Sequence, residues 1–323
     1  MRIIRADVLG FCGGVRRAVA AAERALSENA GGTVYTLGPL IHNPVVLDGL
    51  AARGLRVLEP SAIGTLTKDD TVIIRAHGIS PALERALRER TDAVIDATCP
   101  LVTQSQRRAA DFAAKGYTIV FAGDRNHGEV VGVQGCAEEA ARANGRHCDF
   151  RLIRSVDEAE SLFVEGIPER AVLLSQTTFS IKMWEAICAV LAEKLPALEI
   201  CNTICPATHE RQDALIRLCA HVDGVIVIGG RNSSNTNRLF ATTQKHCAHA
   251  ALIETADEIP EDFYALAAVG ITAGASTPDD VIAAVETRLK VRQLRRARVG
   301  NHVADVRHSG HVEQEPLEAE AEA

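Results

Sequence analysis

The chain has 323 residues, 24% of them charged, and a formal net charge of −7. This acidic balance argues against a general nucleic-acid binder, and no apolar run reaches the roughly 18 residues that span a bilayer. Met1–Asp7 contains no signal-peptide core, and nine cysteines suit a reducing compartment better than a disulfide scaffold. We therefore expect a cytoplasmic protein with no nucleic-acid or membrane partner.

Short extended runs alternate with helix-like stretches along the chain. In chain order, the extended runs cover residues 1–9, 71–75, 93–97, 117–122, 171–175, 198–204, 224–228 and 267–272. This alternation is typical of an α/β fold with parallel sheets. We predict three similar α/β units over residues 1–98, 99–199 and 200–298. Residues 299–323 lack apolar periodicity and end in an acidic run, which predicts a mobile acidic tail.

Three cysteines, Cys12, Cys99 and Cys205, each stand between an extended run and a helix-like run. The N-terminus of a helix favours thiolate over thiol, and thiolate is the form that binds iron or zinc. Three protein ligands leave a fourth metal position open, which points to catalysis more than to structure. Cys201 is a rival ligand, but a helix directly follows Cys205. Spacing alone also leaves open that all three are ordinary buried cysteines.

Polar side chains follow the predicted strands at their carboxyl ends, where open parallel sheets bind ligands. They include imidazoles, hydroxyls and amides: His42, His77, His127, Thr177, Thr178, Ser233, Ser234, Asn235 and Ser276. Such groups next to helix N-termini bind anions, so we predict a phosphate or diphosphate site. Each also has a structural alternative: serine and asparagine are common helix caps, and a single histidine after a strand is often a structural residue with its hydrogen bonds satisfied.

Glu129 lies two residues after His127 in a glycine-containing loop. A carboxyl group in such a loop beside a substrate is a candidate proton donor if its pKa is raised. The alternative is an ordinary solvated loop acid. The chain has no Walker motif, and Gly10–Gly14 is not a dinucleotide fingerprint, so nicotinamide binding has little support.

Five longer segments carry a family resemblance. They are Gly10–Val15, Asp96–Val102, Ser175–Thr178, Arg231–Arg238 and Thr272–Asp279. Together they resemble the signature segments of the 4-hydroxy-3-methylbut-2-enyl diphosphate reductase family, also called LytB. The resemblance runs in order from residue 1 to about residue 290.

The resemblance implies a trefoil of three α/β units around a central [4Fe–4S] cluster that Cys12, Cys99 and Cys205 would bind. It implies diphosphate binding by six residues: His42, His77, Ser233, Ser234, Asn235 and Ser276. It also implies proton handling by His127 and Glu129, with Thr177 or Thr178 as the hydroxyl partner.

The reaction that it implies is the last step of the methylerythritol phosphate route to isoprenoids. Two electrons and two protons remove the allylic hydroxyl of the small-molecule substrate as water. The products are isopentenyl and dimethylallyl diphosphate. The implied partner is a low-potential electron donor such as ferredoxin or flavodoxin.

One departure concerns the loop of the proposed acid. The family commonly has His-Pro-Glu where this chain has His127-Gly128-Glu129, and glycine lacks the fixed φ of proline. Two other functions stay open. One is a hydro-lyase that uses an open iron without redox change, and the other is a non-catalytic iron–sulfur sensor or phosphate-binding regulator.

Overall fold

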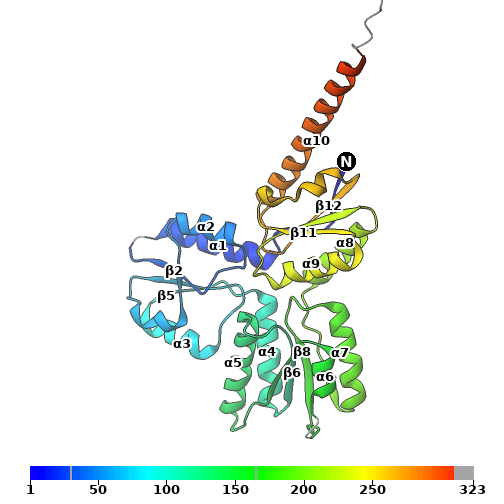
Figure 1. Ribbon diagram of the computed structural model, residues 1–323. Helices are drawn as coiled ribbons and strands as arrows, with labels where there is room; N and C mark the ends of the chain where they lie inside the picture. Colours follow the sequence, from blue (N-terminus) through cyan, green and yellow to red (C-terminus); the bar gives the residue numbers. More distant parts are fainter. Residues whose placement is uncertain (30, 164–165, 309–323) are drawn as a thin grey trace, which may run out of the picture.

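The computed structural model describes residues 1–29, 31–163 and 166–308, which form three parallel sheets of four strands each, with helices on both faces. Figure 1 shows these three units as lobes that meet at the centre of the molecule. The predicted α/β class with three similar units is therefore confirmed.

The first sheet has the strand order β3-β2-β4-β5. Its strands are β2 (Val34–Leu37), β3 (Arg56–Leu58), β4 (Thr71–Ile74) and β5 (Ala93–Asp96). Helices α1 (Gly13–Glu28) and α2 (Pro44–Ala52) cover one face. Helix α3 (Pro81–Arg90) and the short helix η1 (Pro60–Thr65) cover the other. On α1 the buried residues are alanines at helical spacing, Ala18, Ala22 and Ala25, so this helix lies close to the sheet.

The second sheet has the order β7-β6-β8-β9. Its strands are β6 (Thr118–Ala122), β7 (Phe150–Ile153), β8 (Ala171–Ser175) and β9 (Leu198–Ile200). Helices α4 (Pro100–Ala114) and α5 (Gly128–Ala143) pack on one face. Helices α6 (Val156–Ser161) and α7 (Ile181–Lys194) pack on the other. Every residue of β6 and β8 is buried, as expected for central strands of a sheet covered on both faces.

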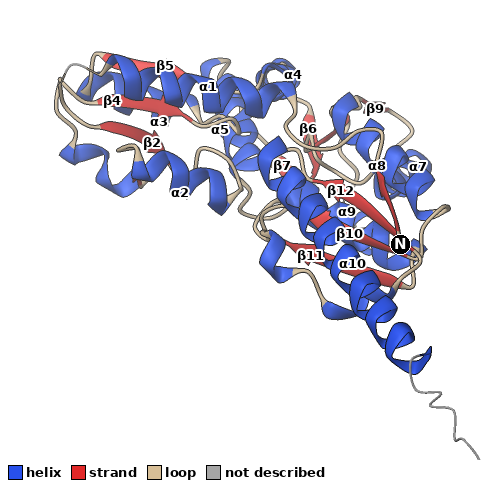
Figure 2. Ribbon diagram, turned by 90° about the horizontal axis from the view of Figure 1, so that it is seen from above, coloured by secondary structure: helices blue, strands red, loops and turns tan. Residues whose placement is uncertain are grey.

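The third sheet joins the two ends of the described chain, in the order β1-β12-β10-β11. Its strands are β1 (Arg2–Arg5), β10 (Gly224–Ile228), β11 (His249–Ile253) and β12 (Ala268–Ala273). Helices α8 (Pro206–Cys219) and α9 (Ser234–His246) cover one face. Helix α10 (Asp279–His308) and the short helices η2 (Ala256–Glu258) and η3 (Glu261–Ala265) belong to the other. Figure 2 shows α10 projecting from this unit.

All three sheets share one topology once β1 is counted as the last strand of the third unit. Sequence order had assigned residues 1–9 to the first unit, but Arg2–Arg5 pair with Ala268–Ile271. The unit boundaries otherwise stay predictions. The tail was expected from residue 299, yet α10 continues to His308, and residues 309–323 lie outside the described residues.

The fourth strand of each sheet leads out of its own unit and into the next. β1 leads to Cys12 and α1, β5 to Cys99 and α4, and β9 to Cys205 and α8. Each of these helices packs on the following sheet, so each cysteine lies at a junction between two units. In the part of the chain that the structure describes, no helix is long and apolar enough to cross a membrane.

Candidate active site

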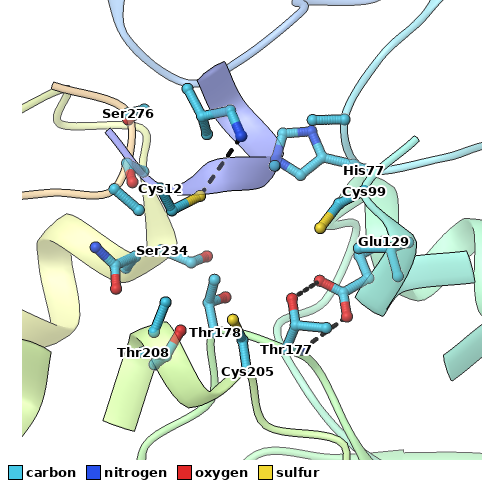
Figure 3. A pocket seen from close by; sticks show the side chains of 18 of the residues that line it. Cys12, His77, Cys99, Glu129, Thr177, Thr178, Cys205, Thr208, Ser234 and Ser276 are labelled. Carbon is cyan, nitrogen blue, oxygen red and sulfur yellow. Dashed lines mark hydrogen bonds between the residues drawn. The ribbon is translucent and has the colours of Figure 1, made fainter. Parts of the chain in front are cut away.

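Three cysteines from three junctions face one central cavity (Figure 3). Cys12, Cys99 and Cys205 are the N-cap residues of α1, α4 and α8. A matching backbone hydrogen bond holds each one to the loop after the third strand of a sheet. The bonds run from Cys12 N to Ala275 O (3.0 Å), Cys99 N to Ala76 O (3.0 Å) and Cys205 N to Thr177 O (2.8 Å). The thiols therefore converge because one local geometry occurs three times.

The spread of the three sulfurs suits a group larger than a single ion. A tetrahedral zinc ion with Zn–S bonds of about 2.3 Å would bring its sulfurs to about 3.8 Å from one another. Within the described residues, three potential ligand atoms lie within 4.8 Å of one another only at His42, His77 and His127. At least one pair of the three sulfurs is therefore more than 4.8 Å apart, which is farther than a single zinc ion allows.

A glycine forms part of the wall between two of the thiols. A Cβ atom placed on Gly14 would lie 2.7 Å from Cys99 Sγ and 3.9 Å from Cys12 Sγ, whereas one on Gly13 would meet nothing within 4 Å. Gly14 therefore keeps open a space that any side chain would fill.

The pKa of Cys205 differs from the expectation of a favoured thiolate. Burial, the largest effect, raises the pKa of this thiol, and negative charge on Cys12 and Cys99 raises it further. Hydrogen bonds from the backbone N–H groups of Ala207 and Thr208 lower this pKa, as expected at a helix N-terminus. Their effect is smaller than that of burial, so the pKa is raised overall. A cationic metal group among the three sulfurs would supply the missing stabilisation of the thiolates.

Cys201, the alternative to Cys205 as third ligand, does not line the cavity. It packs instead against the core between the second sheet and α4 and α5. Its sulfur accepts a hydrogen bond of 3.3 Å from Arg108 Nη1. The geometry favours Cys205 as the third ligand.

Three histidines from two units form a tight group on the cavity wall. The ring centroids of His42 and His77 are 4.5 Å apart, and His127 lies 5.6 Å from His42 and 5.1 Å from His77. Burial is the main cause that lowers the pKa of each, to about 4 for His127. All three are therefore neutral at pH 7. His127 Nδ1 accepts a bond from Glu129 N, so its proton is on Nε2 and available to an anion.

The predicted hydroxyl and amide groups all line the same cavity, but they differ in which hydrogen-bonding atoms are free. Asn235 is 4% exposed, and neither its Nδ2 nor its Oδ1 has a partner among the described residues. The Oγ of Ser233 and the Oγ1 of Thr178 only accept hydrogen bonds, so their protons are free. In contrast, Ser234 Oγ already donates to Asp124 Oδ2 and Ser276 Oγ to His42 O. Free donors facing a cavity are what an oxyanion requires.

The carboxyl group of Glu129 is almost completely buried. It is 1% exposed, at the start of α5, and Thr177 from the β8 loop donates to it twice. Burial raises its pKa to about 7, although the two Thr177 bonds oppose that rise. A carboxyl group that is about half protonated at neutral pH is suited to proton transfer. The alternative of a solvated loop acid is therefore wrong.

The family that matches this chain is described as LytB protein, and the match covers residues 3–290. The chain belongs to the LytB family. Among curated relatives, a protein of Treponema pallidum (strain Nichols) is 43% identical over 89% of this chain and 83% of the relative. One of Caldanaerobacter subterraneus is 43% identical over 90% and 97%. Both are named 4-hydroxy-3-methylbut-2-enyl diphosphate reductase.

Two solved structures show the same fold. One is of (E)-4-hydroxy-3-methyl-but-2-enyl diphosphate reductase, described as the terminal enzyme of the non-mevalonate pathway. It has a TM-score of 0.65 and 37% identity, and the similarity covers 90% of this chain and 99% of that one. The other is a diphosphate reductase of Plasmodium falciparum, with a TM-score of 0.78, 27% identity and coverage of 87% and 86%.

The LytB site contains further residues that the sequence did not reveal. Asp124 receives hydrogen bonds from Ser234 and from Arg238 Nη2, which lies 2.9 Å from both carboxylate oxygens. This cluster joins the second unit to the third at the cavity wall. Burial tends to raise the pKa of Asp124, but Arg238 and Ser234 lower it overall, so the carboxylate is charged at pH 7. Its position after β6 was the one available signal.

Arg75 lies directly beside Gly128 in this chain. A Cβ on Gly128 would lie 2.6 Å from Arg75 Nη2 and 2.8 Å from Arg75 Cζ. The guanidinium group therefore lies against the backbone of the loop that carries Glu129. Gly128 is the first residue of α5, so this contact lies at the start of the helix.

Proposed function

We propose that this protein carries out the reductive dehydroxylation of 4-hydroxy-3-methylbut-2-enyl diphosphate to isopentenyl and dimethylallyl diphosphate. The observation that carries the proposal is the convergence of three thiols, a set of anion-binding donors and a buried acid on one cavity. The names of relatives that are similar along nearly the whole chain support the same reaction.

The cofactor that suits this cavity is a [4Fe–4S] cluster bound by Cys12, Cys99 and Cys205. The wide spacing of the sulfurs and the space kept open by Gly14 support this inference. When bound, such a cluster supplies electrons one at a time, and an iron without a protein ligand acts as a Lewis acid on a hydroxyl group.

The diphosphate end of the substrate would bind where the free donors lie. Ser233, Asn235 and Thr178 offer hydrogen bonds from two units, and the N-terminus of α9 adds backbone N–H groups and a favourable dipole. His42, His77 and His127 complete the set, since their neutral rings can donate N–H groups and Ser276 Oγ already bonds to His42 O. Ser234 and Ser276 would join once their present partners release them.

Glu129 would supply the proton that lets the hydroxyl leave as water. Hydroxide is a poor leaving group, so protonation has to accompany the breaking of the C–O bond. The Thr177 hydroxyl is bonded to the Glu129 carboxyl and lines the cavity, which places it on the path between acid and substrate. His127 binds the substrate and positions Glu129 through the bond between its Nδ1 and Glu129 N.

The overall reaction consumes two electrons and two protons, and we infer a low-potential, one-electron donor such as ferredoxin or flavodoxin. We also infer a cytoplasmic location, because all nine cysteines are free thiols.

The deciding experiment is the measurement of iron and acid-labile sulfide after anaerobic purification, with Cys12→Ser, Cys99→Ser and Cys205→Ser beside the unmodified protein. We expect about four of each per chain, with a sharp fall in every variant. Turnover of the allylic diphosphate is then measured with and without a reductant. Zinc without sulfide would overturn the proposal. Turnover without reductant would indicate a hydro-lyase, and a cluster without turnover would indicate a sensor.

A further inference from the structure

An arginine bridges each of the three junctions between units. Each one lies on the helix that follows one proposed cluster ligand and donates to a backbone carbonyl just before the next ligand. The bonds are Arg17 Nη2 to Thr98 O (3.1 Å), Arg108 Nη1 to Asn202 O (3.4 Å) and Arg211 Nη2 to Gly10 O (2.6 Å).

These three bonds form a closed cycle around the cavity. The helix of Cys12 is bonded to the loop of Cys99, the helix of Cys99 to the loop of Cys205, and the helix of Cys205 to the loop of Cys12. The relative positions of the three cysteines are therefore tied by side chains as well as by the backbone.

Arg211 differs from the other two members of the cycle. It is 3% exposed and lines the central cavity, whereas Arg17 is exposed and Arg108 is only half-buried. It donates a second bond of 2.8 Å from Nη1 to Ala207 O. Its Nε is buried and has no hydrogen-bond partner among the described residues.

Both hydrogen bonds of the Arg211 guanidinium group go to backbone carbonyls, and no ion pair of Arg211 is found among the described residues. Burial lowers the pKa of its guanidinium group, while negative charge on Cys12, Cys205 and, least of the three, Glu210 raises it. An arginine stays protonated in proteins, and a buried charge requires an opposite charge nearby. The sulfurs of Cys12 and Cys205 provide more of it than Glu210 does, when they carry negative charge.

The bond to Gly10 fixes the loop that carries Cys12. Gly10 has φ +78°, and a Cβ there would lie 3.1 Å from Ile282 Cδ1 and 3.2 Å from Asp279 Oδ1. The backbone is therefore held in a conformation that favours glycine. In this conformation the Gly10 carbonyl accepts the Arg211 bond two residues before Cys12.

We propose that Arg211 is a positioning residue for the cluster and that its charge raises the reduction potential of the cluster. This inference rests on the proposed function, since it requires the [4Fe–4S] group. Reduction adds an electron to an already anionic assembly, and a nearby fixed cation stabilises the reduced form more than the oxidised one. Net charge and hydrogen bonds near the sulfurs are recognised determinants of cluster potentials.

The test is a redox titration of the full-length, cluster-loaded protein, followed by electron paramagnetic resonance. Arg211→Met removes the charge and both hydrogen bonds, and Arg211→Lys keeps the charge. The matched control is Arg217→Met, which removes an exposed arginine from the same helix. We expect Arg211→Met to shift the potential to a more negative value, Arg211→Lys to shift it by less than half as much, and Arg217→Met to leave it unchanged.

Retention of iron against a chelator gives a second measurement, in which both Arg211 variants should lose iron faster than the control. An Arg211→Met protein with an unchanged potential would overturn the inference. If that variant does not hold the cluster, Arg211→Lys decides: a potential close to that of the unmodified protein supports the role of charge, and a large negative shift refutes it. Absence of iron and sulfide from the unmodified protein would instead overturn the proposed function.

Discussion

Glu129 and Thr177 are joined by two hydrogen bonds of 2.7 Å, one from the backbone N–H of Thr177 and one from its hydroxyl. Glu129 lies at the start of α5, which follows β6, and Thr177 lies in the loop after the neighbouring strand β8. The pair combines a buried acid with a hydroxyl on the cavity wall. The threonine therefore holds the acid in place and also adjusts its pKa.

We predict that Glu129→Gln keeps the cluster and substrate binding but lowers turnover by about 100-fold or more, the usual cost of losing a general acid. Glutamine keeps the shape of the side chain and carries no transferable acidic proton. The measurement is kcat together with iron content, and Glu138→Gln, an exposed change on the same helix, is the control. Unchanged turnover in Glu129→Gln would remove Glu129 from the mechanism.

The pH dependence of turnover should report the same group. Glu129 donates a proton only when protonated, and burial raises its pKa to about 7. Turnover should therefore decline as the pH rises through about 7. Thr177→Val removes a hydroxyl on the proposed proton path, so it should lower turnover at every pH. It also removes one bond that stabilises the carboxylate, so it should raise the pKa of Glu129 further and move the decline of the remaining activity to higher pH. A pH–rate profile in the two proteins tests this, and a shift to lower pH would contradict it.

Gly14→Ala should weaken cluster binding by about 10- to 100-fold, the range found for changes next to metal ligands. The added methyl group would lie 2.7 Å from Cys99 Sγ. Gly13→Ala is the matched control, because a Cβ there meets nothing within 4 Å. Both variants should unfold at similar temperatures without the cluster, and only Gly14→Ala should retain less iron. Equal retention would mean that the space beside Gly14 is not part of the cluster site.

Binding of pyrophosphate should involve protonation of the histidine group. Burial lowers the pKa of His127 to about 4, and an anion bound beside the ring would raise it, so binding near pH 6 takes up protons. Calorimetry in two buffers of different ionisation enthalpy measures this uptake. His127→Asn retains a helix-capping oxygen but does not titrate, and should take up fewer protons. Equal uptake by both proteins would exclude His127 from the anion site.

Patterns among residues close together in sequence were enough to predict the helices, the strands and most of the residues that line the cavity. Strand–turn–helix alternation and polar residues at strand ends depend only on neighbours in sequence, and Cys12, Cys99 and Cys205 stand at helix starts as expected. The resemblance of several segments to one family then assigned roles that no single motif carries.

What the sequence did not reveal depends on contacts between distant segments. An arginine such as Arg211 reads as an ordinary helix residue, and its bond to Gly10 follows only from the approach of two units. The same holds for Asp124, whose partners Ser234 and Arg238 belong to another unit. The pairing of β1 with β12 likewise has no local signature.

The pairing of β1 with β12 determines when the site can form during synthesis of the chain. Arg2–Arg5 are synthesised 266 residues before their partners Ala268–Ile271. At about 5–20 residues per second, the Cys12 loop waits roughly ten seconds to a minute for its support. The first two sheets can close while the chain is still growing, whereas the third cannot. The proposed metal group would therefore be inserted late, after the loop of Cys12 has gained its support.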